Sequence, residues 1–249
     1  MGCCSSRTGG VKPLFEELIL KIASQNKLNG MKCIELISEY EKRKTNSSNG
    51  VVILQSLFNP LLYPDGMPIT KPEDLKVTEA FLSLEQKDEV KVGNQKIFIL
   101  EYCLSFTSSS DQMMNKISEI DQVLTKENEN TFNGLENFIT NYLNYNLITI
   151  VDNVYAYCNK NKGTKLFGFD IDDMFMNEFD KFKQEVFTYD NISDYIIKIN
   201  QIIHQEEKNK NDKVPYEVLA KLNTEKSNTL FILSELHSDF IENYIKKEK

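Results

Sequence analysis

The chain has 249 residues, with 29 basic and 37 acidic side chains and a formal net charge of −8 at neutral pH. Hydrophobic residues make up 41% of it, which is enough for a globular core and excludes a wholly disordered chain. The acidic balance argues against general nucleic-acid binding, and no stretch reaches the ~18 consecutive apolar residues of a membrane-spanning helix.

The N-terminus carries a lipidation signal in its first six residues, Met1-Gly2-Cys3-Cys4-Ser5-Ser6. Removal of Met1 exposes the amine of Gly2, and Ser6 supplies the small hydroxyl of the N-myristoylation pattern. Cys3 and Cys4 follow directly, within reach of a membrane-resident palmitoyl transferase once myristate has docked the chain. We therefore predict myristoylation at Gly2 and palmitoylation at Cys3 and Cys4. The alternative is an unmodified tail with two idle thiols.

The residues Gly2, Cys3, Cys4 and Ser6 together resemble the N-termini of dual-acylated peripheral membrane proteins of eukaryotic cells. These include calcium-sensor lipoproteins, kinases, small-GTPase scaffolds and membrane-cytoskeleton linkers. The resemblance is confined to this motif and identifies no domain family. It implies attachment by acyl chains to the lipid of a membrane, on its cytosolic face, at the plasma membrane or a specialised membrane.

Behind a flexible acylated tail of residues 1–12, we expect one helical domain over residues 13–249. Pro13 suits a first helical turn, and apolar residues recur at helical spacing until Asn29-Gly30 ends the helix. A second helix is expected over residues 31–44, followed by a polar loop at 45–50.

The next part of the chain is less regular. Residues 51–58 are compatible with a helix or a strand, and residues 59–72 hold four of the six prolines, which predicts an irregular segment. A helix is expected over residues 73–86. Residues 89–104 are compatible with a β-hairpin or with a loop and a helix, and the scarcity of other strand signals favours the helix.

The second half of the chain is strongly helical in pattern. Ser108 to Asp111 resemble a helix N-cap. Helices are expected over residues 113–124, 132–158 and 171–188, then behind a cap at Asn191 or Ser193, and finally over 224–247. The expected fold class is mainly α, a multi-helix globular bundle with a short β-hairpin near residues 89–104 as its one candidate strand pair.

An acidic cluster at Asp170, Asp172 and Asp173 is the best candidate for chemistry. Its D-x-D spacing resembles the nucleophile loop of haloacid-dehalogenase-type phosphatases. That family places a small or β-branched residue after the second aspartate, whereas Asp173 and Met174 follow here, so the match is poor. The EF-hand template also fails, because the central glycine and terminal glutamate are missing. The three aspartates are weak candidates for a divalent metal, and capping of the following helix is favoured.

Other catalytic signals are sparse. The chain has two histidines, which excludes a multi-histidine metal site, and the odd count of five cysteines without a repeated spacing predicts free thiols. Cys33, Cys103 and Cys158 lie in apolar surroundings typical of a core. A phosphate-binding loop pattern is missing. These observations favour a protein that is not an enzyme and has no cofactor.

Two functions from different classes follow. The first is a lipid-anchored peripheral membrane protein, a helical scaffold or adaptor that holds protein partners at the cytosolic face of a membrane. The second is a membrane-recruited regulator of a GTPase, or a hydrolase that uses Asp170 and Asp172.

Overall fold

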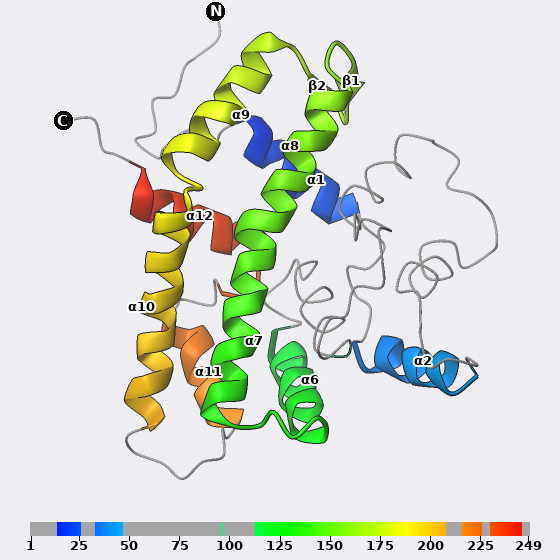
Figure 1. Cartoon of the computed structure of the whole chain (residues 1–249), viewed down its shortest axis with the longest axis vertical. Coiled ribbons are helices and arrows are strands. Elements are labelled where there is room, and N and C mark those ends of the chain that lie inside the picture. The colour runs from blue at the N-terminus through cyan, green and yellow to red at the C-terminus, as the bar shows by residue number, and fades with distance from the viewer. Residues whose placement is uncertain are drawn as a thin grey trace, which may run out of the picture.

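The computed structural model describes residues 14–25, 33–46, 96, 113–207, 216–225 and 230–245. The expected fold class is confirmed, because these residues are mainly α-helical with one short hairpin (Figure 1). The elements are α1 (Leu14–Gln25), α2 (Cys33–Asn46), α6 (Met113–Lys126), α7 (Phe132–Asn144), η2 (Tyr145–Thr149), α8 (Ile150–Lys160), β1 (Lys165–Leu166), β2 (Phe169–Asp170), α9 (Asp173–Glu185), α10 (Tyr189–Glu207), α11 (Tyr216–Glu225) and α12 (Leu233–Tyr244).

One long helical stretch organises the bundle. α7, η2 and α8 follow one another without a break, and α10 runs alongside α7 (Figure 1). A long helix was expected over residues 132–158, and the structure confirms it with one difference. Its middle is a π-helix, in which the Ile150 N–H donates to the Tyr145 carbonyl, five residues earlier.

The core forms where the apolar faces of these helices meet. Leu135, Phe138 and Tyr142 of α7 are almost fully buried, as are Tyr195 and Ile199 of α10. Residues three, four and seven positions apart lie on the same face of a helix. The helical spacing of apolar residues in the sequence therefore identified the buried faces correctly.

The first helix, α1, packs into this core through its aromatic and aliphatic side chains. Phe15 stacks on Phe179 of α9, with ring centroids 4.2 Å apart and an interplanar angle of 9°. The Phe15 ring also contacts Phe182 and Phe187. At the start of α1, the Leu14 N–H donates to Glu178 Oε1 over 2.7 Å. α1 is thus fixed to α9 by an aromatic stack and by a partner for one of its free N–H groups.

The hairpin lies at a position that the sequence pattern did not predict. β1 and β2 pair antiparallel, with Leu166 opposite Phe169. The two turn residues, Phe167 and Gly168, have φ angles of +49° and +94°, which is the geometry of a tight turn with two left-handed residues. Asparagine is usual at the first of these positions, so Phe167 gave no turn signal. The hairpin proposed at residues 89–104 lies outside the described residues apart from Lys96.

The helix expected over residues 171–188 is too long at both ends, because α9 spans Asp173–Glu185 between its caps Asp172 and Val186. Two further helix boundaries were predicted wrongly. α10 begins at Tyr189, before the expected caps Asn191 and Ser193, because Thr188 is the capping residue and its Oγ1 accepts from the Asn191 N–H at 3.2 Å. The helix expected over residues 224–247 is wrong at its start, since Thr224 belongs to α11 and α12 begins only at Leu233.

The turn before α12 explains the second error. Leu230, Phe231 and Ile232 are buried but not helical, and Ile232 has an extended backbone. Because these apolar residues fit the helical spacing of the residues that follow them, the sequence pattern placed them in the same helix as α12.

Candidate functional site

The predicted lipidation residues, Gly2, Cys3 and Cys4, lie outside the described residues together with Ser6. Lipidation therefore stays a prediction. The structure describes the chain from Leu14, the first residue of α1. Across the ranges that are described, no helix is long and apolar enough to cross a bilayer.

The acidic cluster is exposed, and each carboxylate has a local role. Asp172 is the N-cap of α9, and its Oδ1 accepts from the Phe175 N–H at 2.8 Å. Asp173 pairs with Lys162, and Asp170 Oδ1 lies 3.7 Å from the Lys165 Nζ across the hairpin. The capping role predicted for this cluster is confirmed at Asp172.

Metal binding and thiol reactivity find little support among the described residues. Among the described side chains, no group of three or more histidines, cysteines, aspartates and glutamates is arranged to hold a metal ion. Cys158 is fully buried in the core, as predicted, and burial raises the pKa of its thiol to about 12. A thiol in that state is a poor nucleophile at neutral pH.

The most unusual group of polar side chains is buried inside the bundle. Glu16 of α1, Asn146 of η2 and His237 of α12 are each fully inaccessible to solvent. His237 Nδ1 lies 2.9 Å from Glu16 Oε2, and its Nε2 lies 3.0 Å from the Asn146 carbonyl oxygen. We call these three residues the polar centre. It links three elements that are far apart in the sequence.

The π-helix supplies one side of the polar centre. The Asn146 side chain donates to the Tyr142 carbonyl over 2.7 Å, while its own backbone carbonyl faces His237. A π-turn inserts an extra residue and widens the backbone, and such turns are common at functional positions. In this chain the widened turn coincides with the carbonyl that accepts from a buried imidazole.

The polar centre is not a site for substrate chemistry. Both ring nitrogens of His237 are engaged by Glu16 and Asn146, and none of the three side chains is exposed. A general base needs access to the proton that it removes. The arrangement can instead hold α1, η2 and α12 together, and it can hold a proton.

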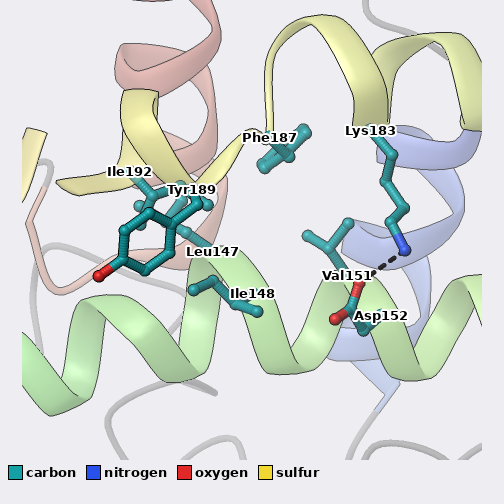
Figure 2. A pocket seen from close by; sticks show the side chains of 8 residues that line it. All are labelled: Leu147, Ile148, Val151, Asp152, Lys183, Phe187, Tyr189 and Ile192. Carbon is teal, nitrogen blue, oxygen red and sulfur yellow. Dashed lines mark ion pairs between the residues drawn. The ribbon is translucent and has the colours of Figure 1, made fainter. Parts of the chain in front are cut away.

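A shallow cleft lies on the surface close to the polar centre, between the junction of η2 and α8 on one side and the end of α9 and start of α10 on the other (Figure 2). Its volume of about 140 Å³ is close to the ~150 Å³ of a cavity that takes a benzene-sized group. We call it the α8–α10 cleft. Its lining residues are Leu147, Ile148, Val151, Asp152, Lys183, Phe187, Tyr189 and Ile192.

The two ends of the cleft differ in character. At one end, Lys183 Nζ pairs with Asp152 Oδ1 over 2.7 Å and lies over the Tyr155 ring. At the other end, Tyr189 is 77% exposed (Figure 2). The ring of Phe187 lies 5.8 Å from that of His237, so one aromatic side chain contacts both the cleft and the polar centre.

Sequence reasoning did not find the polar centre. The available signals were weak: one acidic residue, Glu16, inside the apolar face of a helix, and one histidine, His237, inside another. The sequence pattern around either residue does not show that the two side chains meet, because they are 221 positions apart. The cleft was also missed, since it depends on how the helices pack.

Comparisons of the chain with protein-family models, with curated proteins and with solved structures find no match.

The capping role of Asp172 leads to a stability prediction. Asp172→Ala removes the acceptor of the Phe175 N–H, and we expect it to lower the free energy of unfolding by about 1 kcal/mol. Asp172→Asn keeps a capping oxygen, so it is expected to stay close to the unmodified chain. Asp170→Ala, at an exposed ion pair, should change stability by less than about 0.5 kcal/mol. Urea unfolding of the three variants measures these differences.

A different order of effects would contradict this assignment. If Asp172→Asn destabilised the chain as much as Asp172→Ala, the negative charge and not the cap would be what matters at this position. Stabilisation by Ca²⁺ or Mg²⁺ that is lost in both Asp172→Asn and Asp170→Ala would point to a metal site.

Proposed function

We propose that this protein is a lipid-anchored peripheral membrane protein, a helical scaffold that holds protein partners at the cytosolic face of a membrane. The observation that carries the proposal is the N-terminal motif of Gly2, Cys3, Cys4 and Ser6. It combines a myristoylation pattern with two adjacent cysteines at the positions that palmitoylation would use.

The two lipids are needed together for a physical reason. A single myristoyl chain binds membranes only marginally, with a constant of about 10⁴ M⁻¹, and a second chain adds ~0.8 kcal/mol for each buried methylene. The usual alternative, a polybasic segment, is weak here: residues 2–12 contain only Arg7 and Lys12, worth about 2 kcal/mol on an anionic leaflet. The net charge of −8 opposes adsorption. Palmitoylation of the cysteines would therefore make the attachment long-lived.

The packing of α1 supports this function. α1 is the first described element after the tail, and Phe15, Leu18 and Ile19 are completely buried in the core. A helix held in this way connects the tail firmly to the rest of the bundle. Attachment of the tail to a membrane would therefore hold the whole bundle near that surface.

The α8–α10 cleft supports the scaffold role over an enzymatic one. It offers an apolar hollow of the size of one bulky side chain beside the exposed Tyr189, a combination typical of the anchor pockets in protein interfaces. The alternative, a membrane-recruited regulator of a GTPase or a hydrolase, has less support. Asp170 and Asp172 are already engaged in an ion pair and a helix cap.

Acylation is tested by variants of the tail in a eukaryotic cell. Gly2→Ala blocks myristoylation and should release the protein into the soluble fraction. Replacement of both Cys3 and Cys4 by serine should leave only weak, exchanging membrane binding, because one chain remains. Fractionation combined with metabolic labelling by clickable myristate and palmitate measures both effects.

Ser5→Ala is the matched control, because it changes the same tail without touching the motif. It should fractionate and label like the unmodified chain. The proposal fails if Gly2→Ala and the double serine variant remain on membranes to the same extent as the unmodified chain.

The scaffold role leads to a prediction at the cleft. Tyr189→Ala removes an exposed ring from the rim of the cleft, so it should leave the fold intact and reduce contact with partners. Ile197→Ala is the control, because Ile197 of α10 is also exposed (53%) and does not line the cleft. Proximity labelling from the membrane-bound chain compares the neighbours of each variant.

We expect Tyr189→Ala to lose a defined subset of labelled neighbours that Ile197→Ala retains. Identical labelling for both variants and the unmodified chain would contradict a partner site at the cleft, while leaving the membrane attachment untouched.

A further inference from the structure

We propose that Glu16 and His237 form a proton-holding clamp on α1. The folded chain keeps one proton between these two buried side chains, so that docking of α1 weakens as pH rises above about 6.5, the ordinary pKa of an exposed histidine. The proposal is independent of lipidation and concerns the attachment of the helix that follows the tail.

The clamp follows from which atoms can donate a hydrogen bond. The Asn146 oxygen that faces His237 Nε2 at 3.0 Å is a backbone carbonyl, which can only accept. Nε2 therefore carries a proton. In a neutral imidazole the other nitrogen, Nδ1, is then an acceptor.

That nitrogen faces a carboxyl oxygen, Glu16 Oε2, at 2.9 Å. If neither atom carried a proton, two acceptors would meet at hydrogen-bond distance in a place without solvent, which is unfavourable. One proton must lie between them. The pair is then an imidazolium with a carboxylate, or a neutral imidazole with a carboxylic acid, and the number of bound protons is the same in both.

The surroundings offer no other partner to the carboxyl group. Glu16 Oε1 is buried and has no hydrogen-bond partner in the described part of the chain. The contact with His237 is thus the one hydrogen bond found there for the Glu16 carboxyl oxygens. An ionised carboxylate without that bond would be a buried and uncompensated charge.

The described groups with printed contacts around His237 are uncharged, or their charges are engaged elsewhere. η2 contributes the uncharged Asn146, and the junction of α9 and α10 contributes the ring of Phe187. On α12 itself, Glu235 is exposed and Asp239 accepts from the Tyr195 hydroxyl of α10 at 2.6 Å. Tyr142, one turn before Asn146, stays neutral, because burial raises the pKa of its phenol.

The effect of pH has a definite sign. In the unfolded chain above pH 6.5, histidine is neutral and glutamate ionised, so this pair binds no extra proton, whereas the folded pair binds one. Stability falls with pH wherever the folded state binds more protons. We expect the folding equilibrium constant to fall up to tenfold for each pH unit above about 6.5. Between about 4.3 and 6.5 the proton counts are equal, and the pair contributes no slope.

The test is urea unfolding of the full chain between pH 6.0 and 8.0. The upper limit avoids Cys158, whose folded-state pKa of about 12 adds a separate loss of stability only above the ordinary thiol range of ~8.5. Glu16→Gln is the decisive variant, because its amide can donate to Nδ1 of a neutral ring without an extra proton. We expect it to remove the fall in stability above pH 6.5.

His204→Gln is the matched control. It removes the other histidine, which is half exposed on α10 and 3.6 Å from Glu136, and it should keep the slope of the unmodified chain. Proton release on unfolding at pH 7.5 in a weak buffer gives an independent measurement. The unmodified chain and His204→Gln should each release one proton more than Glu16→Gln.

If Glu16→Gln does not fold, the unmodified chain and His204→Gln still decide the question. The proposal is overturned if the stability of the unmodified chain does not fall between pH 6.5 and 8.0, or if Glu16→Gln keeps the same slope. It is also overturned if His204→Gln removes the slope.

Discussion

A buried imidazole, His237, joins the first described helix to the rest of the bundle. It contacts Glu16 of α1 on one side and the Asn146 carbonyl of the π-helix on the other. Breaking this link by removing one partner would leave a polar group buried without compensation, which costs more than the bond itself contributes. The stack of Phe15 on Phe179 reinforces the same attachment from the side of α9. The position of α1 in the bundle depends on these contacts.

The attachment of α1 to the bundle matters for the proposed lipid anchor. Acyl chains at Gly2, Cys3 and Cys4 would hold the bundle at a membrane only if α1, the helix after the tail, stays packed on the bundle. The protein carries a net charge of −8, so electrostatics does not favour membrane contact, and in the proposed attachment the acyl chains would supply most of the binding energy. The α8–α10 cleft, whose Phe187 ring also contacts His237, is where the proposed scaffold would take up a partner side chain.

The sequence predicted what depends on local pattern. Helical periodicity located most of the helices and their buried faces, and the acidic residues before α9 were correctly expected to cap it. It did not predict features that depend on packing or on unusual turn chemistry. The hairpin turn uses Phe167 where asparagine is usual, the apolar turn at Leu230 imitates a continuing helix, and the contact between Glu16 and His237 joins residues from opposite ends of the chain.

The central claim is that fatty acids, and not surface charge or a spanning helix, bring this chain to a membrane. Intact mass spectrometry of the protein isolated from its native cell tests it most directly. The account predicts a chain without Met1 that carries one myristoyl group on Gly2 and at least one palmitoyl group on Cys3 or Cys4, removed by hydroxylamine. A free or acetylated N-terminus with unmodified thiols at Cys3 and Cys4 would contradict it.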